Sequence, residues 1–385
     1  MGRGRRFPAD VPGAAGSPGR RGGTGAEGSC RRTFIPAGGR RFVNSVALVD
    51  PLLDAEWERS LDAFPEATAF HSSAWLRVLA DTYAFRPIGL LAKHGSTVVG
   101  CLPLVEARTW LTPRRGISLP FTDECRILGD ATARAALVAH ALAEGDARQW
   151  RYCEFRDPAA VDESNPAQDE FFGHALNLEP DAEKVFARLD GAVRQAVRKA
   201  ERGGLRIEFS AGPDAIRDYY ALHCLTRQRH GTPPQPFAFF ANLQRHVLAT
   251  GAGQVVSARH GERVIASAVF IHRGRHAIYK FGASDEAFQA LRANNLVMWR
   301  AIAWYSEKGY ASFDFGRTDP DNEGLRRYKR SWGTEERRVR YFRFDRRSRR
   351  FAAARPGGGW SSRVFRRLPR PVARLIGLAL YRHAA

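Results

Sequence analysis

The chain has 385 residues, of which 44% are hydrophobic, and its formal net charge at pH 7 is +20. This length suffices for two domains that each bury a core, and the hydrophobic content excludes a chain that stays disordered. Residues 1–40 carry +6 of the charge and residues 341–385 carry +11, which leaves +3 for the 300 residues between them. The excess of arginine therefore describes the two ends, and the body of the protein is nearly neutral.

Cysteine and histidine usage argues against a disulfide framework and against a metal site. The five cysteines are odd in number, widely spaced and free of any CxxC pair, which is typical of a reducing compartment. The eleven histidines form no HExxH motif, so we expect no bound metal. No run of about 18 apolar residues and no apolar signal region occurs, so we expect a cytoplasmic protein without a membrane span.

The chain begins with a segment that differs from the rest in composition. Residues 1–40, rich in Arg, Gly and Pro, are predicted to be a disordered leader, or the product of a start codon placed too far upstream. Order is expected from about Phe42. The first predicted elements are a strand over 42–51, helices over 54–64 and 70–83, and a hairpin over 88–108 that turns at His94-Gly95.

The arrangement of helix and hairpin occurs a second time, 166 residues later. An amphipathic helix over 237–248 precedes two apolar runs over 255–273, which again surround a His-Gly pair, His260-Gly261. The shared order and spacing predict a duplicated domain.

The second copy continues with alternating helices and strands. A single helix is predicted over 181–204, and a helix over 293–310 is expected to start on Asn294 and Asn295 as caps. The strand 311–316 that follows is expected to pair parallel to the last strand of an antiparallel meander. This order predicts an α/β fold with a mixed sheet. The remaining predicted elements are a strand at 205–210, a helix at 214–231, meander strands at 254–259, 264–271 and 276–284, and a basic helix at 324–333.

With these elements the chain is similar to the GNAT-type acyltransferases, and its duplication resembles the FemAB-like and BioF2-like branch that has two such domains in tandem. The resemblance covers roughly residues 42–345 and implies two tandem GNAT-like acyltransferase domains, at 41–175 and 176–345, with a basic amphipathic tail at 346–385. It rests on FHSSAWLRVL, VVGCLPLVEAR and ISLPFTDECRIL in the first copy and on VRQAVRKAERGGLRIEFS, LTRQRHGTPPQPFAFF, ANNLVMWRAIAWYSEKGYASFDFGRT and GLRRYKRSWG in the second.

The resemblance also implies where the chemistry takes place. In FemAB-like enzymes an aromatic-lysine pair on the last helix handles the acyl donor, and Tyr328 and Lys329 hold that position here. Acyl transfer builds negative charge on the carbonyl oxygen, which a fixed cation such as Lys329 would stabilise. The alternative is a solvated lysine on a basic helix face. Looser matches to the acceptor cleft bring in Arg194, Arg198, Arg227 and His230.

Three other candidates have two interpretations each. Asp314 lies on an alternating strand, opposite two phenylalanines, and could accept a proton from an amine or be a hydrogen-bonded structural residue. Arg194 and Arg198 stack at i, i+4 and could grip phosphates, or form an ordinary charged face. Asn294 and Asn295 could offer backbone amides to an anion, although capping alone would explain them.

The acyl donor is left open between acyl-CoA and an aminoacyl-tRNA. GNAT domains that bind acetyl-CoA carry a glycine-containing loop before the central helix, whose amides hold the pyrophosphate. Residues 288–297 of this chain contain no glycine. This favours an aminoacyl or other acyl donor without excluding CoA.

The predicted function is transfer of an acyl or aminoacyl group to an amine of a sugar- or peptide-bearing precursor of the cell envelope or of exopolysaccharide. The tail alternates basic and aliphatic residues, which indicates contact with the inner membrane surface. RNA contact through the basic tails, which would suit a tRNA-borne donor, is the alternative for this segment. A non-catalytic binding protein of a polysaccharide-synthesis complex is the alternative function from a different class.

Overall fold

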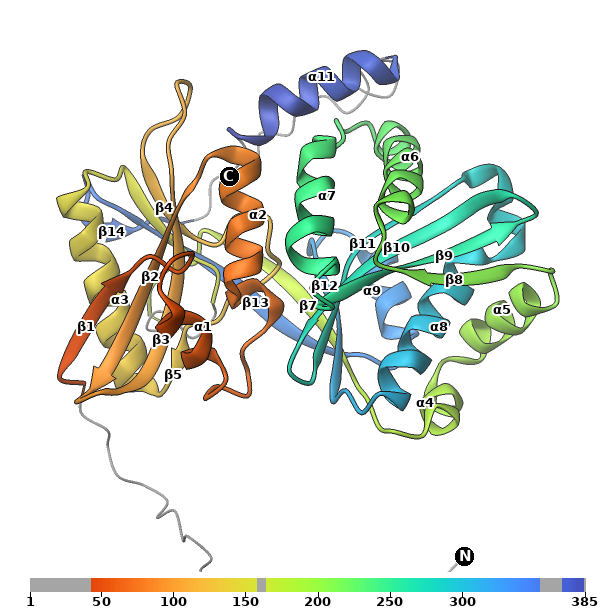
Figure 1. The fold of residues 1–385 in the computed structure, drawn as a ribbon, viewed down its shortest axis with the longest axis horizontal. Helices are drawn as coiled ribbons and strands as arrows, with labels where there is room; N and C mark the ends of the chain where they lie inside the picture. Colours follow the sequence, from red (N-terminus) through yellow and green to blue (C-terminus); the bar gives the residue numbers. More distant parts are fainter. Residues whose placement is uncertain (1–42, 158–163, 354–368, 384–385) are drawn as a thin grey trace, which may run out of the picture. The chain divides into compact units, whose positions relative to one another are not determined.

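The computed structural model describes residues 43–157, 164–353 and 369–383, so the predicted leader at residues 1–40 lies outside the described residues. The first half of the chain forms a sheet flanked by helices (Figure 1). Its strands are β1 (Ser45–Val49), β2 (Arg86–His94), β3 (Thr97–Ala107), β4 (Arg115–Ser118), β5 (Leu128–Gly129) and β6 (Tyr152–Phe155). Its helices are α1 (Ala55–Leu61), the short η1 (Ala69–His71), α2 (Ser73–Tyr83) and α3 (Ala131–Ala147).

Helices and turns of this half begin where the sequence predicts them. Ser72 Oγ accepts a hydrogen bond from the backbone N–H of Trp75 (3.2 Å) and so caps α2, because the first turn of a helix has N–H groups without an internal partner. The hairpin of β2 and β3 turns at Gly95, whose φ of +60° is a conformation that glycine adopts at no steric cost. The predicted helices and hairpin of the first copy are confirmed.

The second half has more strands and helices than the first. Its strands are β7 (Asp169–Asn177), β8 (Arg206–Ser210), β9 (Gly253–His260), β10 (Arg263–Arg273), β11 (His276–Ser284), β12 (Ser312–Thr318), β13 (Glu335–Asp345) and β14 (Arg350–Phe351). Its helices are α4 (Ala182–Arg188), α5 (Gly191–Glu201), α6 (Pro213–His230), α7 (Phe237–Leu243), η2 (Gln244–Leu248), η3 (Glu286–Leu291), α8 (Ala293–Glu307), α9 (Glu323–Arg330) and α11 (Arg370–Tyr381).

Both halves follow the same order of strands and helices. In the first, β1 to β4 pair antiparallel in sequence, and β4 pairs parallel with β6 after α3. In the second, β8 to β11 pair antiparallel, and β11 pairs parallel with β12 after α8. The predicted duplication and the predicted parallel pairing are confirmed, and the protein has a mixed α/β fold.

One long strand joins the two sheets. β13 pairs antiparallel with β7 through residues 335–341 and with β6 through residues 342–345. The path of paired neighbours therefore runs without interruption from β1 to β8. The predicted division between domains at residue 175 falls inside β7.

Two local predictions are wrong. The single helix predicted over 181–204 is two helices, because the chain is extended at Leu189 (φ −66°, ψ 152°) and Asp190 caps α5 through a backbone N–H two residues on (2.8 Å). An aspartate that bonds a nearby N–H favours a helix start over a helix interior. Asn294 and Asn295 do not cap α8, since Arg292 holds the capping position at φ 56° and both asparagines lie in the first turn.

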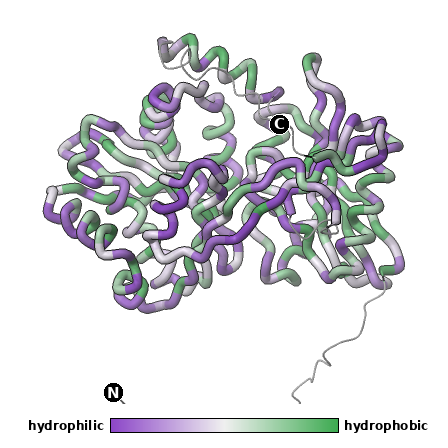
Figure 2. The backbone as a smooth tube through the Cα atoms, turned by 180° about the vertical axis from the view of Figure 1, so that it is seen from behind, coloured by the Kyte–Doolittle hydropathy of each residue, from purple (hydrophilic) through white to green (hydrophobic). Residues whose placement is uncertain are grey.

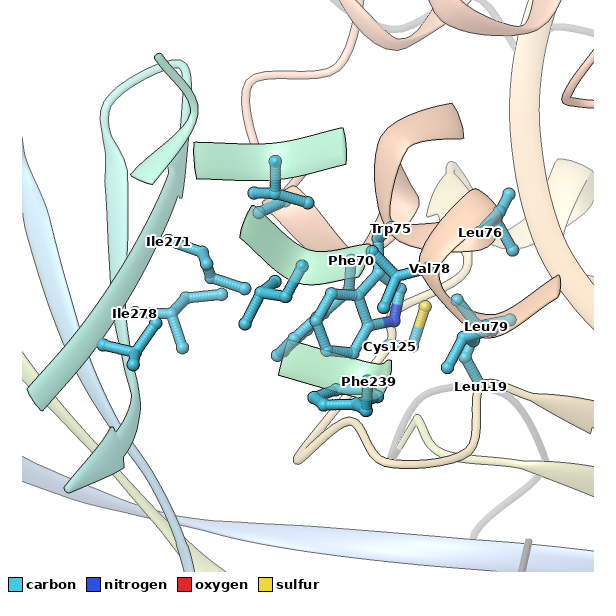
Figure 3. Packing of buried hydrophobic residues seen from close by; sticks show 14 of the residues in the cluster. Phe70, Trp75, Leu76, Val78, Leu79, Leu119, Cys125, Phe239, Ile271 and Ile278 are labelled. Atoms are coloured by element: carbon cyan, nitrogen blue, oxygen red, sulfur yellow. The ribbon is translucent and has the colours of Figure 1, made fainter. Parts of the chain in front are cut away.

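The two halves share a hydrophobic core. α2 and α7, which the repeat alignment equates, pack against each other, and the rings of Trp75 and Phe239 meet edge to face at a centroid distance of 6.0 Å. Figure 3 shows these rings with Phe70, Ile271 and Ile278, members of one buried cluster drawn from both halves. Because separation would expose this cluster to water, we expect the halves to unfold as one unit.

Phe239→Ala should lower the free energy of unfolding by about 3–5 kcal/mol, the usual cost of removing a buried aromatic ring, because Phe239 is fully buried between the halves. Phe209→Ala, at a ring that is 40% exposed, should cost about 1 kcal/mol or less. Urea unfolding followed by circular dichroism measures both. Equal losses in the two variants, or two separate transitions in the wild type, would contradict a shared core.

Candidate active site

A gap between two parallel strands lies within the sheet of the second half. β11 and β12 pair through three residue pairs only, of which Ile278 with Asp314 is the last. Beyond it β11 continues with β10 on its other edge. Among the described strands none pairs with residues 279–283 on the side of the gap, so half of their backbone N–H and C=O groups face it. Such groups can bind the polar atoms of a ligand.

A cavity of about 220 Å³, here called the inner cavity, lies against this part of β11. Tyr279 of β11, Met298 of α8 and Tyr328 of α9 line it. A second cavity of about 670 Å³, the outer cavity, adjoins it, since Ser284, Asn294 and Tyr328 line both. A ligand bound across the two would extend from the N-terminus of α8 to the unpaired edge of β11.

The outer cavity is basic. Lys199 of α5, Arg202 directly after α5 and Arg292 before α8 line it. Asp285 is the only acidic group among the described residues of its lining, and this carboxylate is already paired with Arg263. The three cations fit a ligand that carries phosphate groups.

The segment that leads into α8 determines how an anion could bind there. It forms the short helix η3, in which the N–H groups of Phe288 and Arg292 donate to carbonyl oxygens of the same turn (3.2 and 3.1 Å). At the start of α8 the N–H groups of Asn295 and Leu296 donate to the carbonyl oxygen of Arg292 (3.0 and 3.4 Å). The two N–H groups before them, at Ala293 and Asn294, have no carbonyl of the helix four residues back, and both residues line the outer cavity. An anion would therefore bind to the end of α8 and to side-chain cations, without a glycine loop.

Lys329 is buried, with 4% of its surface exposed. Its Nζ donates hydrogen bonds to the carbonyl oxygens of Gly316 (2.8 Å) and Arg317 (3.0 Å) of β12. Burial lowers the pKa of Lys329 to about 8, although Asp123 and Asp314 act in the opposite direction. An ammonium group has three N–H donors, so one remains after these two bonds. The interpretation as a solvated surface lysine is wrong.

Aromatic residues lie on either side of Lys329 in the sequence. Trp332 is fully buried and its ring lies 6.1 Å from that of Phe315 on β12. Tyr328 precedes Lys329 and lines both cavities, and burial raises its pKa to about 12, so its hydroxyl stays protonated at neutral pH. The short helix thus presents Tyr328 to the cavities and Lys329 to β12.

The first half of the chain contributes a carboxylate to the same region. Asp123 Oδ2 lies 3.1 Å from Nζ of Lys280 on β11. β12 approaches closely at Gly316, where φ is +70° and an added Cβ would lie 3.2 Å from the Asp123 side chain. Burial raises the pKa of Asp123, but Lys280 and Arg317 outweigh this effect and the pKa is lowered, so the carboxylate is charged.

Asp123 and Lys280 were not predicted as site residues from the sequence. The available signal was a charged residue within the apolar strand IYKFGAS, because a buried charge requires a partner. The partner comes from the other half of the chain, 157 residues away, so no local pattern identifies it.

A third cavity, of about 270 Å³, lies between the two halves. Asp123 and Glu124 of the first half and Asp314 and Arg337 of the second are among its lining residues. One oxygen of Asp314 accepts the N–H of Gly316 (2.6 Å) and the other accepts a hydrogen bond from Arg337 (2.7 Å). Both oxygens are engaged, as the structural interpretation of Asp314 requires.

The predicted arginines Arg194 and Arg198 of α5 are not among the lining residues of these cavities. Arg194 donates to two carbonyl oxygens at the end of α4 and in the link after it (both 2.6 Å), and Arg198 lies over the ring of Phe186 at 5.7 Å. The cations that line the outer cavity here are Lys199 of α5 and Arg202, the residue that ends it. Arg202 follows Arg194 and Arg198 at the same spacing of four residues, so the predicted stripe reaches the cavity only at its C-terminal end, whereas Lys199 lies on a neighbouring stripe.

Of the remaining predicted residues, some line a cavity and one is bonded elsewhere. His230 lines the inner cavity, whereas Arg227 donates to a tyrosine hydroxyl of α11 (2.8 Å) and to a carbonyl oxygen after α6 (3.4 Å). Asn294 and Asn295 line the outer cavity, and the Asn294 side chain donates to Ser284 Oγ (2.9 Å).

Comparisons with known proteins identify the fold. The family described as "Acetyltransferase (GNAT) domain" matches residues 187–330. The crystal structure of FemX is similar to the chain with a TM-score of 0.61 and 14% sequence identity, over 74% of this chain and 94% of that chain. The C-terminal domain of a protein described as a lysylphosphatidylglycerol synthetase, from Agrobacterium fabrum, gives a TM-score of 0.52 and 14% identity, over 74% and 91% of the chains. No curated protein sequence matches. The expected GNAT fold is confirmed, and both halves have it in tandem.

Lys329→Met should change how stability depends on pH. The pKa of Lys329 is about 8 in the folded protein and 10.5 in the unfolded chain, so between these values the unfolded state binds more protons and the wild type gains stability as the pH rises. From about pH 7.5 to about pH 9.5 this gain should be about 2 kcal/mol relative to Lys329→Met.

Urea unfolding of each protein at the two pH values measures this difference. Lys184→Met removes an exposed lysine and should change nothing between the two pH values. If the wild type gained about 2 kcal/mol of stability relative to Lys184→Met as well, Lys329 would not be the source of the pH dependence.

Proposed function

We propose that the protein is an N-acyltransferase that takes an acyl or aminoacyl group from a phosphate-bearing donor and transfers it to an amine. The observation that carries this proposal is the parting of β11 and β12, with a cavity lined by residues of β11 beyond the last pair, which continues to a basic outer cavity. A donor with an acyl group at one end and phosphates at the other would place its acyl group in the inner cavity and its phosphates in the basic outer cavity. A buried lysine and a built cavity favour an enzyme over a binding protein of the same fold.

The phosphates of the donor would bind in the outer cavity. Lys199, Arg202 and Arg292 would pair with the phosphate oxygens, and the first-turn amides of α8 would donate to them. Acyl-CoA and aminoacyl-tRNA share this chemistry, because each carries an activated acyl group near phosphates. The GNAT fold favours CoA, whereas the absence of glycine from residues 288–297 favours the other donor.

The acyl carbonyl would lie in the inner cavity, where backbone groups of residues 279–283 face it. The amine nitrogen attacks the carbonyl carbon, and a C–N bond forms while the bond to the thiol or ribose oxygen breaks. The proton that the amine loses ends on the leaving group, so the step needs no further reactant. Donors fixed at the position where charge develops stabilise the transition state without reorganisation.

Lys329 would supply positive charge to this step. Its ammonium is fixed by the carbonyl oxygens of Gly316 and Arg317, which line the cavity between the halves, and its third N–H would donate across the gap to the oxygen on which charge develops. With a pKa of about 8 it is mostly protonated at neutral pH. The acceptor would enter from the cavity between the halves and would react as the neutral amine, because an ammonium group has no lone pair for the attack. We propose an amino group of a sugar- or peptide-bearing envelope precursor as this acceptor.

Lys329→Ala should reduce kcat for acyl transfer by a factor of about 100 to 1000, the usual effect of removing one charge-stabilising donor. The assay incubates the purified protein with either acyl-CoAs or aminoacyl-tRNAs and an amino-sugar acceptor, and mass spectrometry detects the amide product. Lys184→Ala, at an exposed lysine, should keep full activity. Lys329→Ala with a native circular dichroism spectrum and wild-type kcat would exclude the proposed role.

Arg202→Ala combined with Arg292→Ala should raise the KM for the donor about tenfold and leave kcat nearly unchanged, because these cations bind parts of the donor that do not react. Initial rates at varied donor concentration measure this separation. Arg206→Ala, at an exposed arginine paired with Glu208, is the matched control. An unchanged KM in the double variant would place the phosphates elsewhere.

A further inference from the structure

The C-terminal helix α11 lies across α6 and the segment between α6 and α7 (Figure 1). Gly377 permits this position, since a Cβ there would lie 2.0 Å from the carbonyl oxygen of Pro234. Tyr381 Oη accepts a hydrogen bond from Arg227 (2.8 Å) and donates one to the carbonyl oxygen of Pro233 (3.2 Å). The helix is therefore held to the body of the protein along one face.

The loop between β3 and β4, residues 108–114, lies beside the end of this helix. His383 Nδ1 is 2.6 Å from Thr109 Oγ1, and the His383 ring meets that of Trp110 edge to face at 5.7 Å. Arg115 donates to the carbonyl oxygen of His383 (3.4 Å). Helix and loop, which are about 270 residues apart in the sequence, thus form one continuous surface.

This surface exposes large apolar side chains. Trp110 is 85% exposed and Leu375 is 67% exposed. Such exposure is costly in water unless a partner covers it, and several large residues together mark an interaction site. Hydrophobic and hydrophilic residues mix along α11 in Figure 2. The outer face, as we name this surface, comprises Trp110, Leu111, Phe237, Val372, Leu375 and Leu378, all at least 40% exposed.

The segments that build the outer face carry positive charge only. Residues 108–115, 227–246 and 369–383 contain three arginines each and no aspartate or glutamate. Residues 41–340, which include the first two of these segments, carry a net charge of only +3, because acidic residues elsewhere in this range offset the basic ones. A partner that complements the outer face is therefore anionic as well as apolar.

We propose that the outer face binds the surface of a membrane that contains anionic lipids, with the leucines of α11 and Trp110 in the interface and the arginines at the headgroups. A helix that mixes arginine and aliphatic residues, beside an exposed tryptophan, is suited to this position. A nucleic acid would pair with the arginines but leave aliphatic side chains such as Leu375 and Leu378 exposed to water. No helix within the described ranges is long and apolar enough to cross a bilayer, so the contact is with one leaflet.

The test is co-sedimentation of the full chain with vesicles of phosphatidylcholine alone or with about 30% phosphatidylglycerol, at about 0.15 M salt, where surface charges are largely screened. The wild type should bind the anionic vesicles and bind phosphatidylcholine weakly. Leu375→Ser combined with Leu378→Ser should lower the partition coefficient about tenfold or more, because two leucines then no longer leave water. Leu53→Ser, at an 83% exposed leucine outside the outer face, should bind within about twofold of the wild type.

A second measurement locates the contact. Brominated lipids should quench tryptophan fluorescence in the wild type, and Trp110→Phe should remove most of the quenching while binding persists. Wild-type partitioning of the double leucine variant would overturn the proposal, since the arginine-rich ends alone would then carry the binding. The proposal would also be overturned if the wild type does not bind anionic vesicles but binds a single-stranded RNA oligonucleotide, or self-associates in sedimentation velocity, and the double leucine variant loses that interaction.

Discussion

Three residue pairs hold β11 to β12, and where they end the two parallel strands part. The part of β11 beyond these pairs lines the inner cavity, together with Ser267 and Ala268 of β10. On the other side, β12 bulges between Asp314 and Arg317, and the carbonyl oxygens of Gly316 and Arg317 turn to Nζ of Lys329. A buried carbonyl without a partner is costly, so the lysine replaces the strand that is missing there. The same contact that satisfies β12 keeps an ammonium group beside the gap. The gap in the sheet and the position of the Lys329 ammonium therefore depend on the same hydrogen bonds.

The site in the second half depends on the first half. The halves share a core in which Trp75 packs on Phe239, and this packing brings Asp123 to Lys280 across 157 residues of sequence. Without Asp123, Lys280 would be a buried cation with no ion-pair partner among the described residues, which is a large penalty in a low-dielectric interior. The first half thus supplies the carboxylate of Asp123, which pairs with Lys280 in the second half.

Much of the fold could be predicted from the sequence, and the site only in part. The hairpins at Gly95 and Gly261, the helix after the meander and its parallel strand follow from local periodicity and turn chemistry. The break at Asp190 was missed because the apolar period continues across it, while the aspartate cap decides the local structure. Lys329 was found by resemblance to a family, and its burial could not be predicted because its sequence neighbours are charged. The orientation of α5, with Lys199 and not Arg194 at the cavity, is fixed by tertiary packing, which charge periodicity does not contain.

Hydrogen–deuterium exchange of the full chain, with and without acyl-CoA or a charged tRNA, tests most directly whether the donor binds along the unpaired edge of β11. A donor in this position should protect those amides of residues 279–283 that face the gap, and amides of residues 292–297 at the start of α8. This protection should be smaller in the variant with Arg202 and Arg292 replaced by alanine. Protection confined to other segments, with these two unchanged while transfer activity is present, would contradict the assignment of the active site.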